Sequence, residues 1–154
     1  MVKILKDFFS VDDKTSFRPS YQKDHFVRSN GKLFAGYHYL IDVWGRGIYL
    51  ESELEVKKIL KKAATSAGAS VLHILTHRFG DGQGITGIAI LAESHISVHT
   101  WPERDFAAFD IFLCGDTDPE KSLEIIKQYT KASKLKVSKI KRGIIRNKKF
   151  WVVI

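Results

Sequence analysis

Apolar and polar positions alternate with a period of two along much of the chain, which predicts β-strands. Segments rich in β-branched and aromatic residues, bounded by glycine or polar turn residues, indicate strands at residues 33–44, 70–77, 86–91, 96–101 and 107–114. Two further candidates, residues 135–141 and 145–153, follow near the end of the chain. We therefore expect a structure dominated by sheet.

Two segments have helical periodicity instead. Ser52 and Glu55 form a capping box, after which apolar residues recur every three or four positions as far as Ala64. Asp118-Pro119 has the form of an N-cap followed by proline in the first turn, and this second helix is predicted to run to about Ala132. Since several strands follow one another directly, the fold class expected is α+β. We predict a two-layer sandwich whose antiparallel sheet carries two main helices on one face.

The chain has 154 residues, which fits a single domain with a substantial core. Residues 1–31 are polar and mixed, and we interpret them as an N-terminal extension with little structure of its own, leaving residues 32–154 as the domain. The sequence has neither an apolar run long enough to cross a bilayer nor a signal-peptide core at its start. This predicts a cytoplasmic protein that has no membrane partner.

The formal net charge is +8, and many of the basic residues lie within residues 131–142. One interpretation is a surface that binds nucleic acid. The other is a strand with an apolar face, made of Leu135, Val137 and Ile140, and a solvated lysine face. Because no nucleic-acid-binding motif accompanies the charge, the second interpretation is favoured.

Residues 92–103, AESHISVHTWPE, combine a strand-like pattern with unusually many reactive side chains. Alternation places Ile96 and Val98 on one face of this strand, and on the other face it places His95, Ser97, His99 and Trp101. Two histidines, a serine and a tryptophan make poor core material, so the pattern favours a pocket or an interface. The single cysteine, Cys114, excludes a disulfide within the chain and ends a predicted strand, where it is available as a thiol.

Two other kinds of site are not predicted. The pairs His73/His77 and His95/His99 lie in predicted strands, where four residues span about 13 Å. Zinc ligands must come within about 2 Å of the metal, so neither pair can chelate alone and no metal site is expected. Residues 80–84, GDGQG, lack the lysine and the following helix of a phosphate-binding loop.

Residues 93–103 (ESHISVHTWPE) and 107–115 (AAFDIFLCG) resemble the short prokaryotic S-adenosylmethionine decarboxylases, which are pyruvoyl enzymes made as self-cleaving proenzymes. Residues 36–45 (GYHYLIDVWG) are similar to the first strand of that family. Shorter matches are His77-Arg78-Phe79, Asp118-Pro119 and Arg142-Gly143, so the resemblance spans about residues 33–143.

The resemblance implies cleavage between Glu93 and Ser94 into a β chain, residues 1–93, and an α chain, residues 94–154. Ser94 would become a pyruvoyl group, which replaces pyridoxal phosphate and forms a Schiff base with the substrate. By the same resemblance His99 is the base of the processing reaction. Thr86 stands where the family usually has a serine that supports processing, and Cys114 corresponds to the proton donor of the decarboxylation.

The resemblance also implies the substrate and the assembly. Phe79 matches an aromatic residue that stacks on adenine, Glu103 matches the carboxylate that binds the ribose hydroxyls, and Trp101 is expected to line the pocket. The site would lie at a homodimer interface, and the product would be decarboxylated S-adenosylmethionine for spermidine synthesis. Two alternatives stay open: the same core decarboxylating arginine or ornithine, and a homologue that does not process and acts as a binding subunit.

Overall fold

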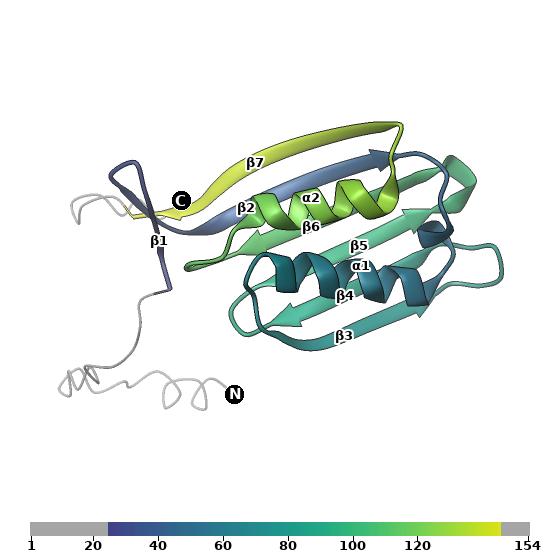
Figure 1. Ribbon diagram of the computed structural model, residues 1–154, viewed down its shortest axis with the longest axis horizontal. Helices are drawn as coiled ribbons and strands as arrows, with labels where there is room; N and C mark the ends of the chain where they lie inside the picture. Colours follow the sequence, from purple (N-terminus) through teal and green to yellow (C-terminus); the bar gives the residue numbers. More distant parts are fainter. Residues whose placement is uncertain (1–24, 146–154) are drawn as a thin grey trace, which may run out of the picture.

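The computed structural model describes residues 25–145 and shows one antiparallel sheet that carries two α-helices on the same face (Figure 1). The helices are α1 (Glu53–Ser66) and α2 (Pro119–Thr130). The strands are β1 (Val27–Ser29), β2 (Lys32–Trp44), β3 (Val71–Arg78), β4 (Ile85–Leu91), β5 (His95–Trp101), β6 (Phe106–Leu113) and β7 (Lys134–Ile144). Within the sheet the order is β2-β6-β5-β4-β3, and β2 also pairs with β1 and β7. The predicted α+β sandwich is confirmed.

The core lies between the sheet and the two helices. Alternate residues of the central strands point toward the helices, so that Ile96, Val98 and Ile111 are fully buried. The predicted helix starts are also confirmed, because the Ser52 hydroxyl accepts a hydrogen bond from the Glu55 N–H and the Asp118 carboxylate accepts one from the Glu120 N–H. Local capping thus fixes where both helices begin.

The segment before β2 has more structure than the sequence pattern indicated. Val27–Ser29 forms strand β1, which pairs with residues 32–34 through a two-residue turn at Asn30-Gly31. Both turn residues have positive φ, 51° and 69°, as a tight hairpin of this kind requires. The expectation of little structure is therefore wrong for residues 27–29, while residues 1–24 lie outside the described residues.

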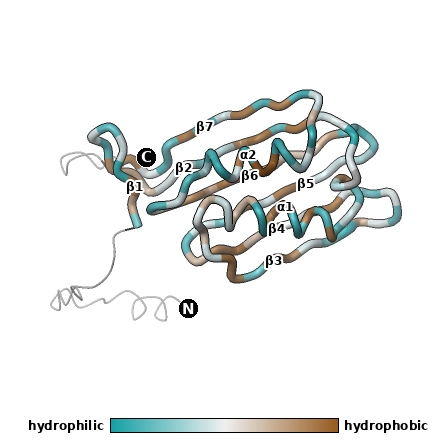
Figure 2. Tube along the Cα trace, in the orientation of Figure 1, coloured by the Kyte–Doolittle hydropathy of each residue, from teal (hydrophilic) through white to brown (hydrophobic). Residues whose placement is uncertain are grey.

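Strand β7 forms an edge of the sheet, and its hydropathy alternates along its length (Figure 2). Leu135 and Val137 pack against the core on the helix side, as predicted. Ile140 does not share their face: it is an odd number of residues away and is exposed on the opposite side. The further strand predicted at residues 145–153 lies outside the described residues, apart from Ile145, which follows β7.

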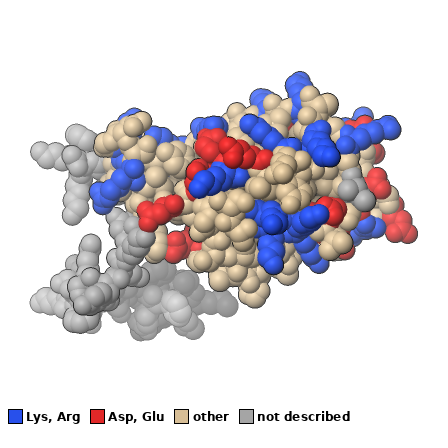
Figure 3. Space-filling model, in the orientation of Figure 1, with Lys and Arg blue, Asp and Glu red and all other residues tan. Residues whose placement is uncertain are grey.

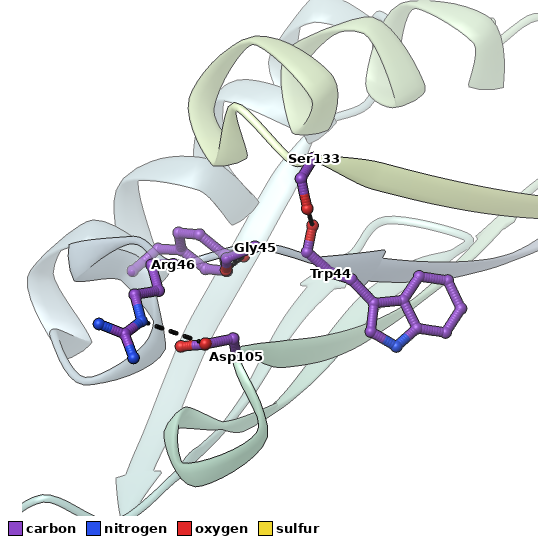
Figure 4. Close-up of polar contacts among 6 residues, drawn as sticks. Trp44, Gly45, Arg46, Asp105 and Ser133 are labelled. Carbon is purple, nitrogen blue, oxygen red and sulfur yellow. Dashed lines mark hydrogen bonds and ion pairs between the residues drawn. The ribbon is translucent and has the colours of Figure 1, made fainter.

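One corner of the sheet is held by contacts that meet where β2 ends (Figure 4). The Trp44 carbonyl accepts hydrogen bonds from the N–H and the hydroxyl of Ser133, which fixes the start of β7. The Gly45 N–H donates to the Asp105 carbonyl at 2.8 Å, and the Arg46 guanidinium contacts the Asp105 carboxylate at 3.2 Å. Asp105 directly follows the 3-10 turn η2 (Pro102–Arg104), so this corner also fixes the position of η2.

Charged side chains are distributed over the face that carries the helices, with Lys and Arg predominating and acidic residues among them (Figure 3). Lys139, for example, contacts Glu120 of α2 at 2.5 Å. No helix within residues 25–145 has the length and apolar content needed to cross a membrane.

Candidate active site

The Glu93–Ser94 peptide bond lies in the short turn that joins β4 to β5. The Leu91 N–H donates a hydrogen bond to the Ser94 carbonyl at 3.0 Å, which closes the hairpin. The next residue, Ala92, donates its N–H to the Ser70 carbonyl at 3.0 Å, which ties the turn to the start of β3. The predicted cleavage point therefore lies at the end of the sheet, in a turn held on both sides by main-chain hydrogen bonds.

The Ser94 hydroxyl has a specific partner. Its oxygen accepts a hydrogen bond from the main-chain N–H of Cys114 at 3.1 Å. Cys114 directly follows β6, and its carbonyl accepts a hydrogen bond from the Thr117 hydroxyl at 2.7 Å. Both Ser94 and Cys114 are half-buried. The register of β5 on β6, with His95 opposite Phe112, brings these two residues together although they are far apart in the sequence.

A second cluster lies on β4 and β5 around His99. Thr86 and His99 are opposite one another across the two strands, and the Thr86 hydroxyl contacts His99 Nδ1 at 2.9 Å. The ring of Trp101 follows on the same face, with its centroid 6.1 Å from that of His99. Both aromatic side chains are exposed, as the alternation of β5 predicts.

These residues line a cavity of about 600 Å³ at the end of the sheet where β3 turns into β4. Phe79, just after β3, and Glu103, in η2, complete a lining that also includes Gly82, Gln83, Gly84, Thr86, His99, Thr100 and Trp101. All three residues predicted to bind substrate therefore share one cavity, and it has the size of a small-molecule site.

Four lining residues were not predicted as site residues from the sequence: Gly82, Gln83, Gly84 and Thr100. The first three belong to the glycine-rich loop, which lacks the motif of a phosphate-binding loop. Thr100 is buried, accepts a hydrogen bond from the Ile85 N–H at 2.8 Å, and donates one to the Leu50 carbonyl at 2.7 Å. The sequence contained a signal for Thr100, since it is a polar residue on the face of β5 that carries Ile96 and Val98. A hydroxyl buried at such a position requires hydrogen-bond partners.

The predicted catalytic residues fall into two groups that do not meet within one chain. Ser94 and Cys114 lie at the β4–β5 turn, whereas Thr86, His99 and the cavity lie at the other end of the same strands. Figure 1 shows the β4–β5 turn and the β3–β4 loop at opposite ends of the sheet. Five residues of strand separate Ser94 from His99, which is roughly 16 Å. Proton transfer needs approach to hydrogen-bonding distance, so His99 cannot act on Ser94 of its own chain in this conformation.

The face of the sheet opposite the helices connects the two groups. It is not covered by any helix within residues 25–145, and large apolar side chains are exposed on it: Leu40, Leu75, Ile90, Trp101 and Ile140. His99 projects from the same face. Exposed apolar surface of this extent is typical of an interaction surface.

Comparison with known proteins gives a consistent result. Residues 37–143 match the family model described as S-adenosylmethionine decarboxylase. The S-adenosylmethionine decarboxylase proenzyme of Methanococcus vannielii is 43% identical over 112 residues, which cover 71% of this chain and 91% of that protein. The proenzyme of Methanococcus aeolicus is 44% identical over 110 residues, covering 70% of this chain and 93% of that protein.

A solved structure is also similar. The crystal structure of adenosylmethionine decarboxylase from Aquifex aeolicus matches with a TM-score of 0.67 at 26% sequence identity, and the match covers 77% of this chain and 98% of that one. The family resemblance stated from the motifs around Ser94 and Cys114 is confirmed by both kinds of comparison.

Proposed function

The chain belongs to the S-adenosylmethionine decarboxylase family and is a decarboxylase, and we propose that it becomes active by cleaving itself between Glu93 and Ser94. The observation that carries this proposal is the hydrogen bond from the Cys114 N–H to the Ser94 hydroxyl, in the turn where the motif predicts cleavage. Its reaction releases carbon dioxide from S-adenosylmethionine, consistent with the family's role in polyamine synthesis. A cytoplasmic location stays a prediction from the sequence.

Cleavage begins with the Ser94 hydroxyl. Its oxygen attacks the Glu93 carbonyl carbon, the C–N bond breaks, and the hydroxyl proton passes to the departing nitrogen, which leaves an ester between Glu93 and the Ser94 side chain. The Cys114 N–H supports this step because it fixes the orientation of the Ser94 oxygen. The two main-chain hydrogen bonds around the turn restrict the movement of the scissile peptide in the same way.

The ester is then opened by elimination. A base removes the α-proton of residue 94, the bond from its Cβ to the ester oxygen breaks, and Glu93 leaves as a carboxylate. Water then replaces the nitrogen of residue 94, releasing ammonia and leaving a pyruvoyl group. We assign the base to His99: when its Nδ1–H donates to the Thr86 hydroxyl, Nε2 carries the free electron pair and can accept the proton.

The separation of Ser94 from His99 requires a second copy of the chain for this step. In our proposal two copies pack through the open faces of their sheets, so that the Ser94 end of one copy meets the His99 end of the other. A two-fold axis makes such an arrangement self-complementary and yields two equivalent sites. The exposed apolar side chains of this face, including Leu40, Leu75 and Ile90, support it because pairing would remove them from water.

The residues present suit the pyruvoyl group and its substrate. The group would supply a carbonyl that condenses with the substrate amine and accepts electrons as carbon dioxide leaves. The adenine ring would stack on Phe79, and the Glu103 carboxylate would accept hydrogen bonds from the ribose hydroxyls. Trp101 offers an aromatic surface to the sulfonium cation. The Cys114 thiol, next to residue 94, would return a proton to the substrate α-carbon.

The test is intact-mass analysis of freshly purified protein, followed by an assay of carbon dioxide release. We expect two chains, residues 1–93 and 94–154, with the second beginning in a pyruvoyl group. Ser94→Ala, the matched control, should stay a single chain and release no carbon dioxide. Carbon dioxide should be released from S-adenosylmethionine and not from arginine or ornithine. A folded wild-type chain that keeps its Glu93–Ser94 bond intact contradicts the proposal, and release from arginine or ornithine alone contradicts the substrate.

A further inference from the structure

His25, in the segment that precedes β1, contacts the residue on the amino side of the predicted cleavage point. Its Nδ1 lies 2.8 Å from Glu93 Oε2. The main chain of His25 is fixed as well, because its carbonyl accepts a hydrogen bond from the Gly115 N–H at 2.7 Å. His25 lies outside the part of the chain that matches the family model, which begins at residue 37.

Three segments that are distant in the sequence converge at this point: the chain before β1, the β4–β5 turn and the loop after β6. Gly115 belongs to the last of these and has φ +63°, a conformation that side chains other than glycine rarely adopt. A Cβ on Gly115 would lie 3.8 Å from His25 Nδ1 and 4.0 Å from Glu93 Oε2. The loop that carries Cys114 therefore packs directly beside the His25–Glu93 pair.

We propose that His25 is a positioning residue for self-cleavage, which holds the Glu93 side chain and so restrains the carbonyl that Ser94 attacks. The inference rests on the proposed function of the Glu93–Ser94 bond. The main-chain hydrogen bonds of the turn are made by Leu91, Ala92 and Ser94. The contact with His25 adds a restraint on the Glu93 side chain itself. Because the His25 carbonyl is hydrogen-bonded to Gly115, the contact also ties Glu93 to the loop whose Cys114 N–H orients the Ser94 hydroxyl.

The same contact acts after cleavage. The Glu93 main chain then ends in a carboxylate, so the residue carries two negative charges beside His25. A hydrogen bond from the His25 imidazole to these carboxylates favours retention of the new chain end at its original place. The pair is partly open to solvent, with side-chain exposures of 44% for His25 and 43% for Glu93. Screening limits its strength, and loss of the pair should slow cleavage about two- to fivefold rather than abolish it.

The test measures the first-order rate of self-cleavage by intact mass after a pulse of cell-free synthesis. The variants are His25→Ala, His25→Asn, Glu93→Ala and the double variant His25→Ala/Glu93→Ala. Asparagine presents an amide nitrogen near the place of Nδ1 and should restore most of the rate that alanine loses. Lys32→Ala, an exposed change in the same β1–β2 hairpin, is the matched control and should cleave at the wild-type rate. Melting of each variant in a Ser94→Ala background verifies that it folds.

The expected result is a slower His25→Ala chain and no additional loss when His25→Ala is combined with Glu93→Ala, because both changes remove the same contact. Wild-type cleavage by His25→Ala, or independent effects of the two changes, overturns the inference while leaving the proposed function intact. Failure of the wild-type chain itself to cleave is a different outcome, which rejects both.

Discussion

The separation of Ser94 and His99 leads to a prediction about mixed dimers. Ser94→Ala removes the nucleophile and His99→Ala removes the proposed base, so neither variant should cleave itself to an appreciable extent. General-base catalysis typically contributes about 10²- to 10⁴-fold to a rate, which sets the size of the loss expected for His99→Ala. When the two variants are produced together, however, one kind of site in the mixed dimer should be intact.

The magnitude follows from the arrangement of the two groups. Each site would combine Ser94 and Cys114 of one copy with Thr86 and His99 of the other, because roughly 16 Å of strand separates the groups within a chain. In a mixed dimer, one site contains both changes and the other contains neither. With equal amounts and random pairing, about half of the dimers are mixed, so about a quarter of all chains should be cleaved.

The assay is co-expression of the two variants with distinguishable tags, followed by intact-mass analysis of both chains. Only the chain that carries His99→Ala should be cleaved, because it alone retains Ser94. The control replaces the Ser94→Ala partner with the double variant Ser94→Ala/His99→Ala, which leaves no intact site and should give no cleavage. The reasoning is refuted if mixed dimers form and remain uncleaved, or if His99→Ala cleaves at the wild-type rate alone.

Three further predictions concern single residues. Thr86→Val should slow cleavage about three- to tenfold, measured as a first-order rate, because it removes the hydroxyl that accepts a hydrogen bond from His99 Nδ1–H while keeping the volume of the side chain. Gly87→Ala should lower the free energy of unfolding by about 1–3 kcal/mol in urea titrations, since its Cβ would lie 2.8 Å from Val56 Cγ1 of the overlying helix. Glu120→Gln should destabilise the fold more at pH 7 than in acid solution in melting experiments. Hydrogen bonds from Lys139, and then from Tyr39, hold the pKa of Glu120 below 4.5, so its contribution is present above that pH and is lost as the pH falls through the lowered value. Equal destabilisation at pH 7 and in acid solution would contradict this assignment.

The strands, both helix starts and the face on which each side chain of β5 lies could be predicted because all three depend on local geometry. Side chains alternate along a strand, so His99 and Trp101 had to share a face opposite Ile96 and Val98. The caps at Ser52 and Asp118 are likewise contacts between residues two or three positions apart. The distance from Ser94 to His99 was also implied, because it follows from the rise of a strand.

The tertiary structure alone decided which distant residues meet. Ser94 reaches Cys114 because β5 pairs with β6 in one register, and a shift by one residue would turn the opposite face of the strand toward the helices. Strand β1 and the contact of His25 with Glu93 depend on where the chain before β2 returns beside the sheet. Such contacts are set by pairing and packing across the whole domain. The sequence by itself therefore determined the chemistry available to this protein, and the fold decided which residues of other segments gather around Ser94 and around His99.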